Sequence, residues 1–282
     1  MIDTDFLREL NRFNLIVTKR ITSNYAGPRR SYATGHGMLF KDHRMYTPGD
    51  DIRAIDWRVY ARTENYYLKN YEEERSMTVH ILVDSSSSMN YGKPYTKFEF
   101  ASMIGVGFAY LALKENEKFK FSTFDEHVAT FRSSRGRGHL AAMVHYLNSM
   151  KPRGKGNFKE SMDSYRKYIK GKSVVIIISD FLTDPDIVEK AMVNFAKQEV
   201  KVIQVLDRVE KDMLLQGDLR LEDLESNSTM RTYISARLRE EYKNRLNDHT
   251  AKIRQGCHRF GAHFEQVISD EPIFDAFFRI LR

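Results

Sequence analysis

Residues 77–84 read MTVHILVD and residues 173–180 read SVVIIISD. Both runs are largely apolar, about one strand in length, and each ends in an aspartate. Continuous apolar runs of this kind are typical of strands that are buried on both faces of a parallel sheet. The two segments therefore predict the centre of a sheet whose carboxyl edge carries Asp84 and Asp180.

Strands and helices are predicted to alternate along the chain on both sides of these segments. Thr96 and Glu99 have the spacing of a capping box, and the apolar segment after them predicts a buried helix. This alternation predicts a doubly wound, mostly parallel α/β sheet, whereas residues 208–234 are expected to be irregular. Further strands are expected at 118–124, 201–207 and 263–269, and further helices around 140–147, 158–169, after Asp184, at 235–259 and at 271–281.

The first 75 residues have a different character. Apolar residues at helical spacing predict an amphipathic helix over 3–22. The segment 27–60 is rich in Gly, Arg, Asp and Tyr, and short β-segments are expected around 38–40 and 66–71. We therefore expect an N-terminal extension over residues 1–75 and an α/β domain over residues 76–282.

Composition and charge exclude several classes of protein. Aromatic residues make up 12% of the 282 residues, which argues against a disordered chain. The single cysteine, Cys257, cannot form an intrachain disulfide or complete a cysteine-based metal cluster. The start of the chain lacks a signal-peptide pattern, and no apolar run is long enough to span a membrane. These features predict a cytoplasmic protein.

The loop that follows the first central strand reads DSSSS at residues 84–88. Its alternate residues Asp84, Ser86 and Ser88 can face one point and offer a carboxylate and two hydroxyl oxygens. Mg²⁺ prefers oxygen ligands of this kind, with few carboxylates and several retained waters. Asp180 could join directly or through water, so the sequence predicts a divalent cation site at this edge.

The Asp84-x-Ser86-x-Ser88 pattern, followed by Met89, resembles the metal-ion-dependent adhesion site of von Willebrand factor A domains. That pattern also takes an Asp from the end of a later strand and a Thr from a later loop. Asp180 matches the Asp, whereas Gly156 stands at the Thr position. The resemblance implies Mg²⁺, or Mn²⁺ or Ca²⁺, held by Asp84, Ser86, Ser88 and Asp180, with Asn157 in place of the threonine.

Two interpretations of this site remain open. Gly156 offers no side-chain ligand, and the adjacent Arg153 and Lys155 would repel a cation. In the first interpretation a metal ion binds, and a carboxylate of a partner completes its coordination. In the second, Asp84 accepts backbone N–H bonds and only organises the loops.

The stretch 46–89, which contains GDDIRAIDW at 49–57, is similar to the signature of the prokaryotic domain of unknown function 58 family. In that family such a segment precedes an A-type domain, and LRLEDLES (219–226) and GAHFEQVISDEP (261–272) also fit its pattern. The family has no established enzyme activity, and its members tend to be encoded beside MoxR-type AAA+ ATPases. The resemblance therefore implies a non-enzymatic interaction module that is an adaptor or partner of such an ATPase, or that binds its client.

The segment GDDIRAIDW has two interpretations. Its charged residues Asp50, Asp51, Arg53 and Asp56, with Trp57 and Arg62, could form a functional cluster. We favour an internal network in which an aspartate caps a short helix, the two arginines pair with carboxylates and the tryptophan packs. No nucleophile–base pair is evident in the sequence, so we do not expect catalysis.

Two basic loops support an alternative function. Residues 132–139 read RSSRGRGH and residues 151–159 read KPRGKGNFK, and the whole chain carries a net charge of +7. Glycines between basic residues allow a close approach to phosphates, which favours binding of nucleic acid or another polyanion. A Mg²⁺-dependent hydrolase that uses Asp84 and Asp180 is a third hypothesis.

Overall fold

The computed structural model describes residues 6, 8–10, 38–73, 77–131, 137–222, 224 and 228–281. The chain divides into a larger unit, Met1–Pro28 with Met77–Arg282, and a smaller unit, Arg29–Ser76. The expected division was 1–75 and 76–282. The structure differs from it because Phe6 and Leu10, which were expected to lie in the N-terminal extension, are buried in the core of the larger unit. Residues 6 and 8–10 are helical, and the rest of the helix predicted over 3–22 lies outside the described residues.

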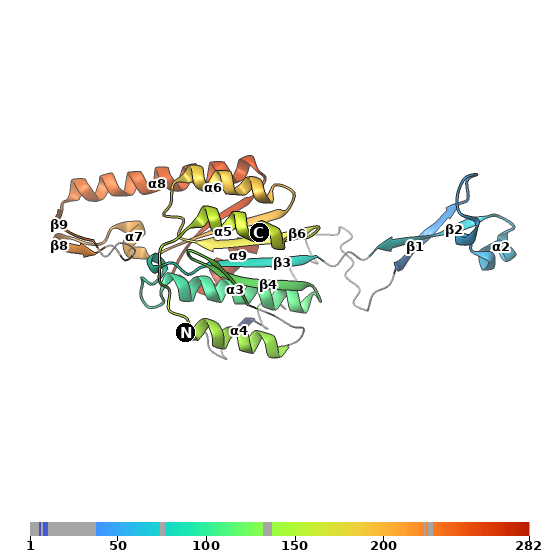
Figure 1. Ribbon diagram of the computed structural model, residues 1–282, viewed down its shortest axis with the longest axis horizontal. Helices are drawn as coiled ribbons and strands as arrows, with labels where there is room; N and C mark the ends of the chain where they lie inside the picture. Colours follow the sequence, from blue (N-terminus) through green and yellow to red (C-terminus); the bar gives the residue numbers. More distant parts are fainter. Residues whose placement is uncertain are drawn as a thin grey trace. The chain divides into compact units, whose positions relative to one another are not determined.

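The larger unit is built on a six-stranded sheet with the order β10-β7-β6-β3-β4-β5 (Figure 1). All neighbouring strands are parallel except β4 and β5, so the predicted doubly wound, mostly parallel sheet is confirmed. The strand β5 was not predicted from the sequence. The strands are β3 (Thr78–Asp84), β4 (Lys118–Phe124), β5 (Val128–Phe131), β6 (Ser173–Ser179), β7 (Glu199–Leu206) and β10 (His263–Ile268).

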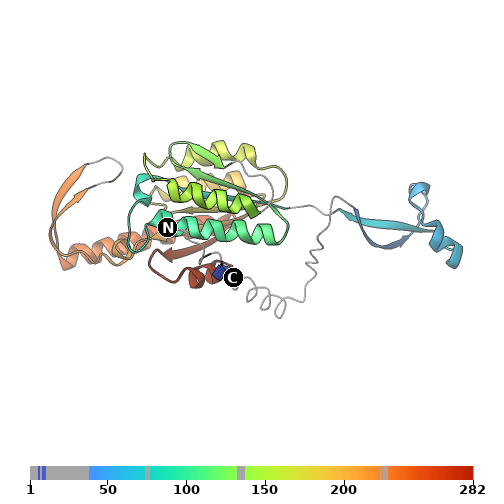
Figure 2. The same cartoon turned by 90° about the horizontal axis from the view of Figure 1, so that it is seen from below.

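Helices cover both faces of the sheet (Figures 1 and 2). The strand β3 explains why, since Ile81 and Val83 join one apolar cluster and Leu82 joins the other. Helices α3, α4 and α9 contribute to the first cluster, and α5, α6 and α8 contribute to the second. The helices are α3 (Lys97–Lys114), α4 (Arg137–Ser149), α5 (Phe158–Tyr165), α6 (Pro185–Met192), α8 (Ala236–Arg259) and α9 (Ile273–Leu281), with the short 3-10 helices η2 (Ser87–Met89), η3 (Arg166–Tyr168) and η4 (Val193–Phe195).

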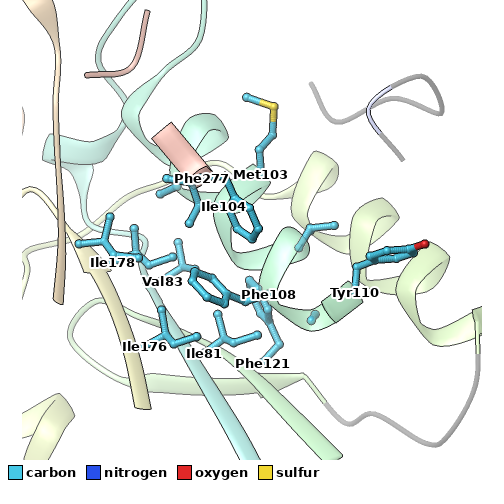
Figure 3. Close-up of a cluster of buried hydrophobic side chains, with 14 of the residues drawn as sticks. Ile81, Val83, Met103, Ile104, Phe108, Tyr110, Phe121, Ile176, Ile178 and Phe277 are labelled. Carbon is cyan, nitrogen blue, oxygen red and sulfur yellow. The ribbon is translucent and has the colours of Figure 1, made fainter. Parts of the chain in front are cut away.

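Helix α3 lies at the centre of the first cluster. The predicted capping box is present, since Thr96 Oγ1 accepts from the Glu99 N–H at 3.1 Å and Glu99 Oε2 accepts from the Thr96 N–H at 3.0 Å. A Cβ atom added at Gly107 would lie 2.8 Å from the Phe277 ring. The glycine therefore lets α3 pack closely against α9, and Figure 3 shows Phe277 among the clustered side chains of α3 and the sheet.

The segment 208–234 contains regular structure, so the expectation of an irregular segment was wrong. It forms α7 (Arg208–Asp212) and the antiparallel pair β8 (Gly217–Glu222) and β9 (Thr229–Ile234). Along β8, half-buried residues alternate with exposed ones, so the strand lacks the apolar run that marks a core strand. This hairpin follows β7 and leads into α8, so it rises from the carboxyl edge of the sheet (Figure 1). No helix in the described part of the chain is long and apolar enough to cross a membrane.

The smaller unit is a β-hairpin with two short helical segments in its connection. The two predicted β-segments are present, although both are longer than expected. Asp51 and Asp56 cap the two helical segments, as the internal-network interpretation predicted. The elements are β1 (Met38–Met45), η1 (Ile52–Ala54), α2 (Trp57–Thr63) and β2 (Tyr67–Glu73).

Asp50 is held by an arginine within the smaller unit. The Arg44 guanidinium donates to both oxygens of Asp50, at 2.8 and 2.7 Å. Two details of the internal network differ from the prediction. The arginine that pairs with Asp50 is Arg44 rather than Arg53 or Arg62, and Trp57 is 55% exposed, so it packs only in part, with its ring edge-on to Tyr60 at 5.9 Å.

Candidate functional site

The strand order reverses between β3 and β6, and in doubly wound sheets ligands bind at the carboxyl ends of such strands. Asp84 is the last residue of β3, and Asp180 directly follows β6. The neighbouring strand β7 is followed by Asp207. All three side chains are buried, so three adjacent strands bring carboxylates to one edge of the sheet.

The loop after β3 is organised around the Asp84 carboxylate. Its Oδ1 accepts from the Ser86 N–H at 2.9 Å, and its Oδ2 accepts from the Ser179 hydroxyl at 2.6 Å. The hydroxyls of Ser86 and Ser88 are 3.1 Å apart. Burial, together with the nearby Asp180, raises the pKa of Asp84 to about 7. The structure thus brings Asp84, Ser86 and Ser88 together, and the backbone bond to Asp84 is the one that the second interpretation requires.

The basic loop at 151–157 lies against the DSSSS loop. The Ser87 N–H donates to the Gly154 carbonyl at 3.0 Å, and the Arg153 N–H donates to the Ser85 carbonyl at 3.1 Å. Asn157 stands at the start of α5, and its N–H donates to the Asp125 carbonyl. Among the hydrogen bonds of the described residues, none joins the Asn157 side chain to the two loop serines.

Lys97, the first residue of α3, was not among the site residues predicted from the sequence. Its Nζ donates to Asp180 Oδ2 at 2.9 Å and to Glu210 Oε1 at 2.7 Å. The Lys97 side chain is fully buried. Glu210 lies on α7, where its Oε2 also accepts from the Asp207 N–H at 3.0 Å. The ends of β6 and β7 are therefore joined through one ammonium group.

The surroundings of Lys97 keep it charged. Burial alone would lower the pKa of its ammonium, but Asp180 and Glu210 oppose this and the net shift of the pKa is upward. Burial raises the pKa of Glu210, and Lys97 opposes that change. The capping-box spacing of Asp207 and Glu210 was the one signal in the sequence that placed a second carboxylate here.

These contacts do not fit the metal ion that the resemblance implies. The Asp180 oxygens accept from Lys97 Nζ and from the Leu182 N–H, and both Asp84 oxygens also have donors. Gly156 supplies no ligand. In the described part of the chain, no group of three or more His, Cys, Asp and Glu side chains could hold a metal ion. The hydroxyls of Ser86 and Ser88 are the ligands left, and two neutral oxygens are a weak site.

The edge of the sheet next to Asp180 is exposed and partly apolar. Phe181 has a φ of 51°, a left-handed conformation that costs a residue with a Cβ about 1 kcal/mol or more. Its buried ring packs 5.5 Å from the Phe158 ring, and its carbonyl lies 2.8 Å from His249 Nε2. This turn leaves Leu182 50% exposed beside a groove of about 450 Å³. The groove is lined by Leu182, Thr183, Asp184 and Pro185 and by Tyr242, Arg245, Leu246 and His249 of α8.

Comparison with known proteins places the chain in a family. Residues 42–252 match the family model described as "Protein of unknown function DUF58". The uncharacterized protein Rv1480 of Mycobacterium tuberculosis is 25% identical over 273 residues, which cover 95% of this chain and 86% of that protein. The uncharacterized protein YeaD of Bacillus subtilis is 24% identical over 136 residues, which cover 48% of this chain and 32% of that protein.

Two solved structures are similar to this chain at low sequence identity. The crystal structure of the conserved hypothetical protein BatB from Bacteroides thetaiotaomicron gives a TM-score of 0.44 at 14% identity, covering 73% of this chain and 97% of that one. The SpRpn10 VWA domain gives a TM-score of 0.42 at 12% identity, covering 72% and 93%. Since the family model covers most of the sequence, the chain belongs to the DUF58 family, as its GDDIRAIDW and DSSSS motifs implied.

Proposed function

We propose that this protein is a cytoplasmic, non-enzymatic interaction module that binds a partner protein at the carboxyl edge of its sheet. One contrast carries the proposal. The charged groups Asp84, Lys97 and Asp180 are buried and bonded within the protein, whereas apolar side chains around them are exposed. A substrate would need access to the charged groups, but a protein partner needs the exposed apolar surface.

The exposed surface suits a protein partner. Leu182 is 50% exposed beside the groove, and Tyr91 and Tyr95 in the segment between β3 and α3 are each 38% exposed. Tyrosines are enriched at the energetically important centres of interfaces. A partner segment that buries an apolar side chain against Leu182 would remove this surface from water, which is favourable.

The partner that we propose is a MoxR-type AAA+ ATPase or a client that it remodels. The support is the family resemblance, in which such ATPases are encoded nearby. The resemblance also suggested that a bound metal would recruit a carboxylate of the partner. The contact proposed here uses the exposed apolar surface and does not require a metal ion.

A charge placed in the groove tests this proposal. We expect Leu182→Glu to weaken binding to a MoxR-type ATPase of the same organism at least about tenfold, because a carboxylate must then be desolvated in the interface. Isothermal titration calorimetry of the purified proteins measures the change. Val193→Glu is the matched control, since Val193 is 57% exposed and lies beyond the far end of α6, toward the start of β7.

The proposal is contradicted by unchanged binding in Leu182→Glu, or by binding of nucleic acid in its place. If Leu182→Glu binds the ATPase as wild type does, the groove is not the contact. The alternative is nucleic-acid binding through residues 151–159, where Lys151, Arg153 and Lys155 are exposed. That alternative predicts retardation of nucleic acid at low salt that falls steeply as salt rises and is lost in Arg153→Glu with Lys155→Glu. Residues 132–136 of the other basic loop lie outside the described residues.

A further inference from the structure

The carboxylate that the metal-binding pattern takes from a later strand already has a cation in this protein. Asp180 Oδ2 lies 2.9 Å from Lys97 Nζ, with the two side chains 5% and 0% exposed. The same ammonium lies 2.7 Å from Glu210. Lys97 reaches this position because it is the first residue of α3, directly after the capping residue Thr96.

We propose that Lys97 is a built-in cation that replaces the divalent ion of the adhesion-type site. The carboxyl edge of the sheet then keeps its folded arrangement without metal. Asp180 and Glu210 obtain their positive neighbour from the chain itself, and the DSSSS loop is held by its bonds to Asp84 rather than by shared coordination of an ion.

The balance of charge supports this assignment. Four carboxylates gather at this edge, from Asp84, Asp180, Asp207 and Glu210. A buried, charged carboxylate such as Asp180 is strongly destabilising without a positive neighbour, so a cation beside it is favoured here. A lysine ammonium is a compact point charge with three donors, and two of them are used by Asp180 and Glu210. The N-terminal end of the 18-residue helix α3 adds partial positive charge beside it.

The replacement also changes how a partner can bind. A divalent ion with an open position can accept a carboxylate from another protein, but the Lys97 side chain has no exposed surface. A partner therefore cannot reach this cation. The metal part of the inference does not depend on the proposed function, because stability and metal binding are measured without any partner.

The first test is a metal titration of the wild-type protein after treatment with EDTA. We expect 1 mM Mg²⁺ or Mn²⁺ to give no binding heat and no change in the Tm, because a ligand that binds the native state must raise its stability. A rise in the Tm of about 4 °C or more, which corresponds to metal at roughly ten times its Kd, would overturn the proposal.

The second test removes the internal cation. We expect Lys97→Met to lower the Tm by about 10 °C in EDTA, because it leaves the buried Asp180 carboxylate and the partly exposed Glu210 carboxylate without a counter-charge. We expect Mn²⁺ to raise the Tm of this variant by a few degrees, because the carboxylates are then free to bind it. Lys197→Met, at an exposed lysine, is the matched control and should show neither effect.

Each remaining outcome also decides the question. A Lys97→Met protein that is as stable as wild type in EDTA shows that the ammonium is not the required cation. If the variant does not fold in EDTA but folds in Mn²⁺, the proposal is supported. If the variant folds in neither condition, the wild-type titration alone decides whether the proposal holds. Wild-type protein that Mn²⁺ does not stabilise does not bind the ion at this site.

Discussion

Two ion pairs of similar length lie in very different surroundings. The pair of Lys97 and Asp180 at the carboxyl edge of the sheet is 2.9 Å long, with side chains 0% and 5% exposed. The pair of Arg44 and Asp50 in the smaller unit is 2.7 Å long, with side chains 48% and 20% exposed. Water can replace a lost partner in the exposed pair but not in the buried one. We therefore expect the same chemistry to be essential to the fold in one unit and dispensable in the other.

The largest expected effect comes from removing one carboxylate of each pair. We expect Asp180→Asn to lower the free energy of unfolding by about 3 kcal/mol, since the buried Lys97 ammonium loses one of its two carboxylates and keeps only Glu210. We expect Asp50→Asn to change stability little. Urea unfolding followed by far-UV circular dichroism measures the larger unit. The fluorescence of Trp57, the single tryptophan, follows the smaller one.

Equal losses of stability in the two variants would contradict this difference between the two ion pairs. They would mean that the smaller unit depends on its exposed pair as strongly as the larger unit depends on its buried one. In Asp180→Asn, the urea midpoint of the Trp57 fluorescence can also be compared with that of the circular dichroism. If both midpoints fall to the same urea concentration, the two units unfold together.

A smaller effect on stability is expected from protonation of His80. This buried basic group bonds to a tyrosine hydroxyl, whereas Lys97 bonds to carboxylates. His80 Nδ1 lies 2.9 Å from the Tyr165 hydroxyl, and burial, with a contribution from Lys120, lowers the pKa of His80 to about 4. The unfolded chain takes up this proton near pH 6.5. Stability is therefore lost as the pH falls from about 6.5 towards 4, by about 2 kcal/mol at pH 5.

Urea midpoints at pH 7 and pH 5 measure this loss, and His80→Asn is the comparison. The variant should lose about 2 kcal/mol less than wild type between these two pH values, because only the wild type has His80 to protonate. If wild type and His80→Asn lose the same stability between pH 7 and pH 5, His80 does not resist protonation in the folded state.

The smallest effect is expected where packing alone is changed. A Cβ at Gly107 would lie 2.8 Å from Phe277, so we expect Gly107→Ala to destabilise the larger unit by about 1 kcal/mol after the better helix propensity of alanine is included. Gly138→Ala in α4 is the control, because nothing lies within 4 Å of its Cβ, and it should not destabilise. Urea midpoints compare the two variants, and equal values would contradict the close packing of α3 on α9.

Local patterns in the sequence were enough to predict much of this fold. The apolar runs that end in Asp84 and Asp180 define the two central strands, and their ends define the edge where the site lies. The strand β5 and the hairpin of β8 and β9 were missed because their side chains are only partly buried. A strand without a continuous apolar face gives little periodic signal.

The site was predicted less completely, for a physical reason. Asp84, Ser86 and Ser88 are neighbours in the sequence, so their meeting follows from one loop. Lys97 is 83 residues from Asp180 and 113 residues from Glu210. A lysine at the start of a helix is usually exposed, and its burial here depends on where three strands end. That arrangement exists only in the folded sheet.

The contact of Phe6 with Phe274 has a consequence for how the protein is made. Their rings stack with centroids 5.8 Å apart, and Phe6 and Leu10 join the core formed by α3 and α9. A ribosome releases Phe6 long before it has synthesised Phe274. The Phe6 ring therefore cannot pack against Phe274 until α9 has been synthesised. This part of the core is then completed only when α9 reaches Phe6.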